Sequence, residues 1–173
     1  VADMYMHTGT IAEQILEAGI SANLSCGGVY FGAPEDFSPE TCGDCRNQAA
    51  LTEEWHGAGA GQILVDASVH GEYTSNPPLW RWMAEYAAEH RLGMHVHVSE
   101  TQSEHQASLE RWGKTPIQAL DGCGVWDCGR SLAAHCVYTT EEDWALMAEK
   151  GISCVHNPWS NLKLGSGVAP IPA

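Results

Sequence analysis

Strand-like and helix-like segments alternate about six times along the chain, and this alternation constrains the fold more than any other feature. It calls for a parallel sheet whose strands are joined by crossover helices, so we expect an α/β fold in one domain. One expected strand ends near Tyr5, and the others occupy residues 20–24, 62–69, 92–98, 130–134 and 152–155. The expected helices occupy 10–19, 45–56, 101–112, 115–122 and 140–151, with another starting at Asn76. Residues 26–44 and 157–167 are expected to be loops.

Residues 92–101 place polar side chains at the end of an apolar expected strand. His95 and His97 are two residues apart and share one face, and Glu100 follows where the strand gives way to a loop. An imidazole at a strand end with a carboxylate three residues later suits a metal ligand beside a proton carrier. The same pattern also suits a buried polar strand end that caps the next helix. The local pattern alone favours neither interpretation.

Four histidines stand at the carboxyl ends of successive expected strands, at positions 70, 97, 135 and 156. In a (β/α)8 barrel such strand ends converge on one mouth, where barrel active sites lie, whereas an open sheet spreads them in a row. We therefore favour a segment of a barrel over a doubly wound sheet. His95 is interpreted as a core or supporting residue. Histidines without this placement are interpreted as surface or helix residues: His7, His56, His90 and His105.

The composition excludes several classes of partner. The net charge is −14 with only eight Lys and Arg, so neither nucleic acid nor an anionic membrane is expected, because phosphates are bound by basic patches. No apolar run approaches the ~20 residues of a membrane span. Hydrophobic residues make up 44% of the chain, which indicates a packed globule rather than disorder.

The cysteine pattern indicates a reducing compartment. Seven cysteines, an odd number without the spacing of a small disulfide scaffold, predict a cytoplasmic protein. Cys42 and Cys45 form a lone CxxC, and a zinc ribbon would need a second pair, for which Cys123 and Cys128 are weak candidates. Plain thiols in loops are the favoured interpretation.

Four motifs carry a family resemblance: Ser68-Val-His70, His95-Val-His97-Val-Ser-Glu100-Thr, Leu132-Ala-Ala-His135-Cys-Val and His156-Asn-Pro-Trp-Ser-Asn161-Leu-Lys-Leu-Gly-Ser-Gly. The chain resembles the amidohydrolase superfamily, closest to its methylthioadenosine/S-adenosylhomocysteine deaminase and chlorohydrolase (cytosine deaminase-like) branch. The last three motifs, in this order and spacing, are specific to the superfamily. The resemblance covers essentially the whole chain. It implies a (β/α)8 TIM barrel and a metal-dependent hydrolase acting on C–N bonds other than peptide bonds.

The resemblance also implies roles for individual residues. His97 would be the metal ligand on the fifth barrel strand, and Glu100 the catalytic proton shuttle that also contacts the substrate. His135 would be catalytic by orienting the metal-bound water, and His70 would bind substrate. The cofactor is one divalent metal, with zinc expected and iron as the alternative. Metal-bound hydroxide would attack the amine-bearing carbon of a purine nucleoside or related aminoheterocycle, and the amine would leave as ammonia.

Two parts of the family pattern are missing from the chain: an HxH pair at the end of the first strand and an Asp at the end of the eighth. The chain therefore resembles strands two to seven, and residues 1–173 are expected to form a single catalytic-barrel segment whose N-terminal and C-terminal neighbours are absent. Such a segment has open sheet edges and is expected to hold a catalytic metal poorly by itself. Either it belongs to a longer protein, or another polypeptide completes it.

Alternative functions remain open within and outside this class. A triazine- or guanine-type amidohydrolase fits the same motifs, and an inactive barrel fragment fits the missing ligands. A metal-binding protein without catalysis is disfavoured, because structural sites do not need Glu100 and His135. The expected partner is a small-molecule aminoheterocycle or nucleoside, and homo-oligomerisation is left open.

Arg46 is the one Lys or Arg among residues 1–80 and lies in or just after the expected loop 26–44. In a barrel that loop would overhang the active-site mouth. Nucleosides of the resembled branch can carry a carboxylate tail, as S-adenosylhomocysteine does, and a guanidinium binds carboxylates with two parallel hydrogen bonds. Arg46 is therefore a candidate substrate-binding residue. The alternative is a surface ion pair with Asp44 or Glu53, which would contribute little.

Overall fold

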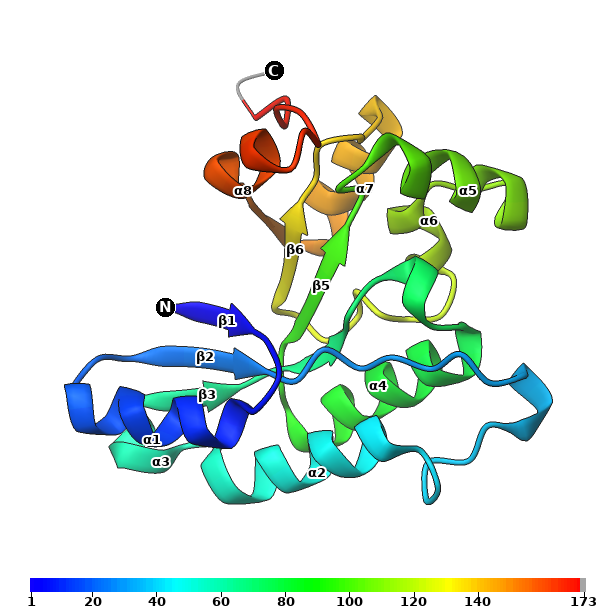
Figure 1. The fold of residues 1–173 in the computed structure, drawn as a ribbon. Coiled ribbons are helices and arrows are strands. Elements are labelled where there is room, and N and C mark those ends of the chain that lie inside the picture. Colours follow the sequence, from blue (N-terminus) through cyan, green and yellow to red (C-terminus); the bar gives the residue numbers. More distant parts are fainter. Residues whose placement is uncertain (172–173) are drawn as a thin grey trace.

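The computed structural model describes residues 1–171, and within them seven short strands form two parallel sheets (Figure 1). The first sheet has the order β1–β2–β3 and the second has the order β4–β5–β6–β7. Each pairing joins consecutive strands in parallel, as crossover connections require. Strands β1 to β7 are Ala2–Met4, Ala22–Ser25, Ile63–Val65, Ala67–Val69, Met94–Val98, Ser131–His135 and Ile152–Val155.

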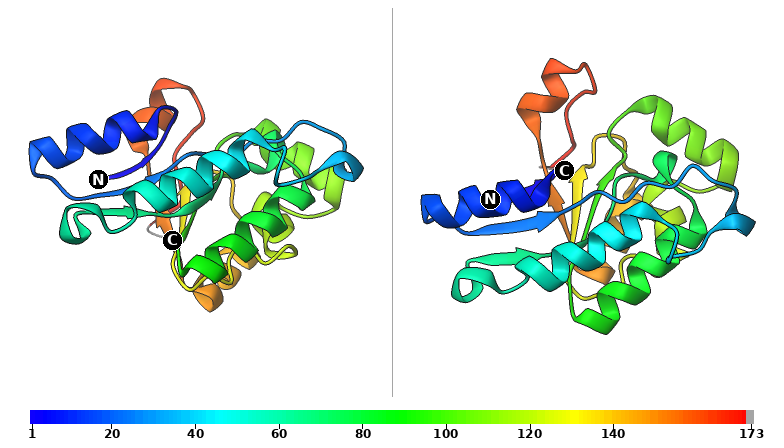
Figure 2. Two further views of the ribbon diagram at one scale, coloured as in Figure 1. Left: turned by 90° about the horizontal axis from the view of Figure 1, so that it is seen from below. Right: turned by 60° about the horizontal axis from the view of Figure 1, so that its bottom comes forward.

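Helices connect the strands and pack beside them. Helices α1, α2 and α3 accompany the first sheet, while α4 packs against β4 and α7 against β7, as two further directions of view also show (Figure 2). The helices α1 to α8 are Thr8–Ala18, Gly43–Trp55, Ala58–Gly61, Pro77–His90, Gln102–Trp112, Pro116–Asp121, Glu141–Lys150 and Pro158–Lys163, with short 3₁₀ turns at Pro34–Asp36 and Glu72–Thr74.

The expected strand 62–69 is split in two at Asp66. Its buried side chain accepts hydrogen bonds from Asn23 on β2, from the backbone N–H of Gly93 before β5 and from Arg130 before β6. The Asp66 carboxylate therefore hydrogen-bonds to segments of both sheets, at the junction between β3 and β4 where the strand bends. With β3 and β4 counted as one bent strand, the order is that of six neighbouring barrel strands.

Two hydrophobic clusters hold the sheets against the helices. The larger one fills the space between β4–β7 and the helices around them, with Trp80, Met83 and Trp126 among its fully buried side chains. The smaller one joins α1 to β2 and β3 through Ile15, Leu24 and other apolar side chains. The apolar residues of the strands therefore position the strand ends, where the polar candidates lie.

The structure corrects the expected boundaries at two places. The first helix begins at Thr8, two residues earlier than the Thr10 cap predicted, because the Thr8 hydroxyl donates to the Tyr5 carbonyl and the Thr10 N–H donates to the His7 carbonyl. The expected loop 157–167 is wrong over Pro158–Lys163, which forms α8. Its proline occupies the first turn, where a missing N–H is tolerated.

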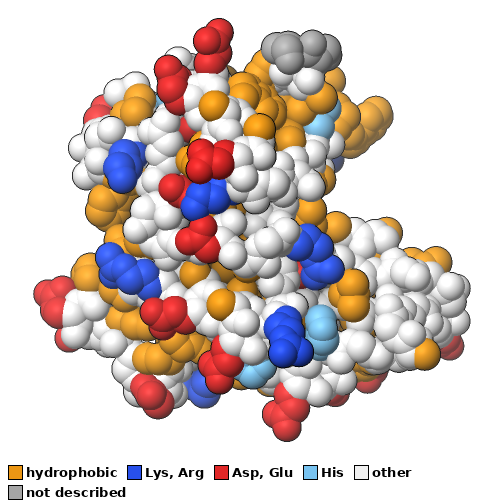
Figure 3. Space-filling model, turned by 180° about the vertical axis from the view of Figure 1, so that it is seen from behind, with side chains coloured by type: hydrophobic (Ala, Val, Ile, Leu, Met, Phe, Trp, Pro, Cys, Tyr) orange, Lys and Arg blue, Asp and Glu red, His pale blue; other side chains and the backbone are white. Residues whose placement is uncertain are grey.

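Within residues 1–171, no helix combines the length and apolar character needed to span a membrane. The space-filling view from behind shows acidic and basic side chains interspersed, with no large basic patch on that face (Figure 3).

Candidate active site

Three of the four histidines predicted at strand ends lie side by side. His70 follows β4, His97 lies on β5, and His135 is the last residue of β6. The ring centroids of His70 and His97 are 5.2 Å apart, and those of His97 and His135 are 5.5 Å apart. The parallel pairing of these three strands brings their carboxyl ends to one edge, as the barrel interpretation required. No such ring contact involves His156 within the described residues.

His97 is oriented by a neighbouring backbone carbonyl. Its Nδ1 lies 3.0 Å from the carbonyl oxygen of His70, which can only accept, so Nδ1 carries the proton and Nε2 carries the lone pair. Burial, followed by the neighbouring imidazoles His70, His95 and His135, lowers the pKa of His97 to about 4. The imidazole is therefore neutral at pH 7, the form in which histidine binds metals.

His135 is oriented by Asn161 and lies beside Glu100. Its Nδ1 is 2.7 Å from Asn161 Oδ1, again an acceptor, and 3.7 Å from Glu100 Oε1. Both His135 and Asn161 are buried. Asn161 comes from α8 and was not predicted as a site residue. The motif containing it was visible in the sequence, but only the short helix reveals that its amide faces His135.

His70 follows the same pattern. The Thr74 hydroxyl donates to the Gly71 carbonyl, so its oxygen accepts from His70 Nδ1 at 3.0 Å. Burial lowers the pKa of His70, and the charge of Glu100 opposes that shift. All three imidazoles are thus fixed through Nδ1, and none makes a hydrogen bond through Nε2 within residues 1–171.

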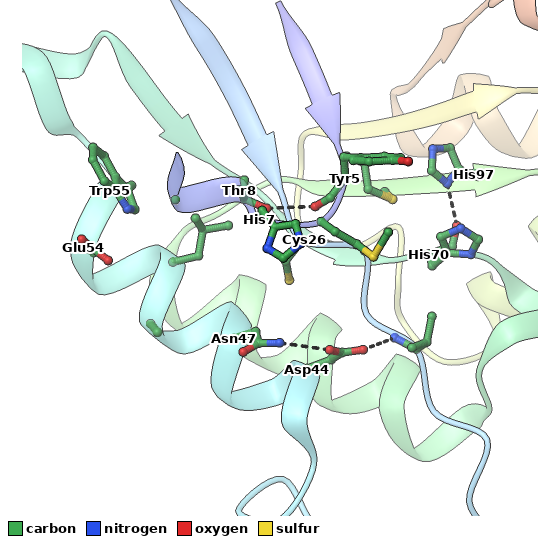
Figure 4. Close-up of a pocket in the computed structure, with 17 residues that line it drawn as sticks. Tyr5, His7, Thr8, Cys26, Asp44, Asn47, Glu54, Trp55, His70 and His97 are labelled. Atoms are coloured by element: carbon green, nitrogen blue, oxygen red, sulfur yellow. Dashed lines mark hydrogen bonds between the residues drawn. The ribbon is translucent and has the colours of Figure 1, made fainter. Parts of the chain in front are cut away.

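A cavity of about 830 Å³ opens beside this edge (Figure 4). His70 and His97 line one end, and Glu54 and Trp55 of α2 lie at the other, with Tyr5, His7 and Cys26 between them. His7, expected to be a surface or helix residue, lines this cavity from the turn before α1, where its backbone has a positive φ of 60°. Glu100 and His135 do not line the cavity and adjoin it through His97.

The α2 wall of the cavity contains a fixed carboxylate. Asp44 accepts from the backbone N–H of Val29 at 2.8 Å and from the Asn47 amide at 3.2 Å. Burial raises the pKa of Cys26, which also faces the cavity, to about 11, so its thiol stays protonated at neutral pH. This cysteine is a poor nucleophile there.

Arg46 lies in the first turn of α2 and is not among the residues that line this cavity. It is exposed, and its Nη1 donates to the Glu40 carbonyl at 2.8 Å. Neither Asp44 nor Glu53 forms an ion pair with it in the described part of the chain. The carboxylate-binding role of Arg46 stays a prediction.

His95 occupies the supporting position expected of it. It is buried, its Nδ1 is 3.0 Å from the Ser25 hydroxyl, and its ring centroid is 6.0 Å from that of His97. The seven cysteines are all free thiols, and Cys42 and Cys45 are buried at the start of α2. Cys42 is the N-cap residue of α2 and Cys45 lies in its first turn, so the prediction that these thiols lie in a loop is wrong.

The imidazole tautomers fit part of a metal centre. A ligating histidine commonly donates its other ring N–H to a carbonyl or carboxylate, as Nδ1 of His97 does, and so presents Nε2 to the metal. Catalytic zinc sites usually have three protein ligands. Residues 1–171 contain no group of three His, Cys, Asp or Glu placed to hold a metal ion.

The lowered pKa of His97 predicts a pH-dependent stability of the metal-free protein. Between pH 6.5 and 4 the unfolded chain binds a proton at this position and the folded chain does not. The free energy of unfolding therefore has its full contribution from His97 above pH 6.5 and loses it as the pH falls towards 4. The expected loss from His97 is about 3 kcal/mol. Urea denaturation with chelator at pH 7 and pH 4 measures it. The free energy of unfolding should fall more in the wild type than in His97→Gln, and equal losses would contradict the assignment.

Comparisons with known proteins show the family to which the chain belongs. A family model described as the amidohydrolase family matches residues 1–173. Two relatives named 5-methylthioadenosine/S-adenosylhomocysteine deaminase, from Halothermothrix orenii and Moorella thermoacetica, are 38% and 40% identical over 170 and 172 residues. Each alignment covers 98% of this chain and 38% of the relative, so the chain spans well under half the length of these proteins.

Solved structures show the same fold. An adenosine deaminase from Xanthomonas campestris with bound zinc matches 96% of this chain and 37% of its own, with a TM-score of 0.81 and 26% identity. A guanine deaminase from C. acetobutylicum with bound guanine matches 99% of this chain and 42% of its own, with a TM-score of 0.85 and 20% identity. These matches confirm the predicted barrel fold, of which the chain covers a part. The chain belongs to the amidohydrolase family.

Proposed function

We propose that this chain supplies strands two to seven of a metal-dependent aminohydrolase that deaminates a purine nucleoside or related aminoheterocycle. The observation that carries the proposal is the position of Glu100, 3.7 Å from His135 at the edge where His97 presents Nε2. A carboxylate that can move protons beside an oriented imidazole, with the neutral His97 on the neighbouring strand, suits hydrolysis of an amidine. The relatives named 5-methylthioadenosine/S-adenosylhomocysteine deaminase support this substrate class.

Each residue of the site has a distinct proposed role. His97 would hold the divalent metal, zinc rather than iron, and the metal supplies hydroxide at neutral pH by lowering the pKa of water. Glu100 takes one proton from the attacking water and gives it to the ring nitrogen next to the amine-bearing carbon. It then takes the second proton from the newly attached hydroxyl and gives it to the leaving amine. The C–N bond breaks, water supplies the new oxygen, and ammonia leaves. His135, fixed by Asn161, orients the attacking water, and His70 contacts the ring.

The proposal concerns the complete barrel, meaning a protein in which residues 1–173 are joined by the two remaining strands. The cavity of about 830 Å³ lies within the size range of small-molecule sites and is large enough for a nucleoside. The segment offers no group of three metal ligands within residues 1–171, so an inactive segment is what we expect from this chain alone. Its seven free thiols support a cytoplasmic location.

An ammonia-release assay on the zinc-loaded complete barrel tests the proposal. Methylthioadenosine, S-adenosylhomocysteine and adenosine represent the proposed class, and guanine and an amino-triazine represent the alternatives. Release of one ammonia per nucleoside supports the proposal. Release from guanine or triazine alone would replace it with the corresponding alternative, and no release from any of the five would overturn it.

Arg46→Ala tests whether this residue binds the carboxylate tail. If the guanidinium leaves the Glu40 carbonyl to hold the tail, the variant should lose roughly 10- to 100-fold in kcat/KM on S-adenosylhomocysteine and almost nothing on adenosine. Arg81→Ala, on α4, is the control for removing a positive charge elsewhere. Equal kcat/KM values for the wild type and Arg46→Ala on both substrates would exclude the role.

A further inference from the structure

Glu104 is the third residue of α5 and closes a capping box with Thr101. The Thr101 hydroxyl accepts from the Glu104 backbone N–H at 3.1 Å, and the Glu104 carboxylate accepts from the Thr101 backbone N–H at 3.4 Å. Such boxes normally serve to satisfy unpaired N–H groups at the start of a helix. Two more occur in the described residues, with Gln118 in α6 and Asp143 in α7 at the equivalent position.

The Glu104 carboxylate accepts hydrogen bonds from more backbone N–H groups than the equivalent side chains of Gln118 and Asp143. It also accepts from the backbone N–H of Ser99 at 2.8 Å and of Glu100 at 2.7 Å, both shorter than its bond to Thr101. Gln118 and Asp143 accept from no backbone N–H other than that of their own N-cap residue. The residue is only 5% exposed. Three backbone donors therefore converge on one buried carboxylate, and two of them belong to the turn that carries Glu100.

This turn is joined to the one that follows His135. The Ser99 carbonyl accepts from the backbone N–H groups of Val137 and Tyr138, each at 2.9 Å. Ser99, His135 and Cys136 all have positive φ, at 53°, 77° and 48°, conformations that residues with side chains adopt at a cost. Hydrogen bonds that compensate this strain hold both turns in place. Glu104 supplies those on the Ser99–Glu100 side.

We propose that Glu104 is a positioning residue for the proposed deamination, acting by fixing the backbone of Ser99 and Glu100 and so the placement of the Glu100 carboxylate beside His135. The inference rests on the proposed function. The Glu104 carboxylate is buried and is bound by three backbone N–H groups, so it acts through Glu100 and not on the substrate. Burial raises its pKa to about 7 against the pull of the three N–H donors, so assays belong at pH 8, where the carboxylate is ionised.

Glu104→Asp separates positioning from helix capping. An aspartate at this position keeps the charge and closes the box, as Asp143 does in α7, but it is one methylene shorter and retreats from Ser99 and Glu100. In the zinc-loaded complete barrel we expect kcat to fall about 10-fold with KM and zinc content nearly unchanged, the signature of an interaction lost in the transition state. Glu104→Gln, which replaces one acceptor oxygen by a donor, should lose more.

Gln118→Ala is the matched control, because it opens the capping box of α6 and should leave kcat unchanged. Amide hydrogen exchange gives a readout that needs no substrate: Ser99, Glu100 and Val137 should exchange faster in Glu104→Asp than in the wild type. Unchanged exchange, or a kcat no lower than that of Gln118→Ala, would overturn the inference. Absence of ammonia release in the wild type is a separate result and would overturn the proposed function instead.

Discussion

Glu100→Gln in the complete barrel is expected to keep its zinc and to lose roughly 10²- to 10⁴-fold in kcat for ammonia release, the usual contribution of general acid–base catalysis. The glutamine has nearly the same shape but cannot take up and return a proton. The carboxylate stands 3.7 Å from His135 Nδ1, whose proton is already donated to Asn161, so this nitrogen cannot substitute for Glu100 as a proton acceptor.

Zinc content by mass spectrometry and steady-state ammonia release are both needed for this variant. Retained zinc with lost turnover identifies Glu100 as the proton carrier. Glu110→Gln, an exposed carboxylate in α5, is the control for a surface charge. Near-normal turnover in Glu100→Gln would remove the residue from the mechanism.

His97→Ala is expected to abolish both zinc binding and activity. The Nε2 of His97 is the ligand atom proposed here, and the loss of one of a small set of ligands removes most of the affinity of a metal site. His90→Ala, which removes an imidazole stacked on Tyr86 at the end of α4, should retain stoichiometric zinc. Stoichiometric zinc in His97→Ala after dialysis would show that the ligand lies elsewhere.

The strand ends could be predicted from the sequence because three physical rules agree there. An apolar run of strand length, a polar residue at its end and a helix cap soon after place His70, His97 and His135 at strand ends. The capping residues Thr101, Thr115 and Thr140 have side chains that accept from the third helical residue, as their spacing indicates.

Other parts of the fold depend on contacts distant in sequence and could not be read locally. The strand is split at Asp66, whose carboxylate accepts hydrogen bonds from Asn23, Gly93 and Arg130. All three donors are distant from Asp66 in sequence. The helix α8 has six residues, too few for a periodic apolar pattern, so its Asn161 was not recognised as the partner of His135.

The candidate site was predicted only in part, for the same reason. The residues on the three neighbouring strand ends follow from the sequence. His7 is exposed, as expected, but its place in the cavity lining depends on the turn between β1 and α1 and could not be predicted locally. The reach of Glu104 to Ser99 and Glu100 was also hidden, since its sequence position predicts a capping box and nothing more.

The anomalous scattering signal of zinc in crystals of the metal-loaded complete barrel tests the proposed metal ligand most directly. One peak is expected in contact with His97 Nε2, on the side of the strands that Glu100 and His135 share, with Nδ1 of His97 still donating to the His70 carbonyl. A zinc peak at the buried Cys42 and Cys45 thiols, with none at His97, would contradict it.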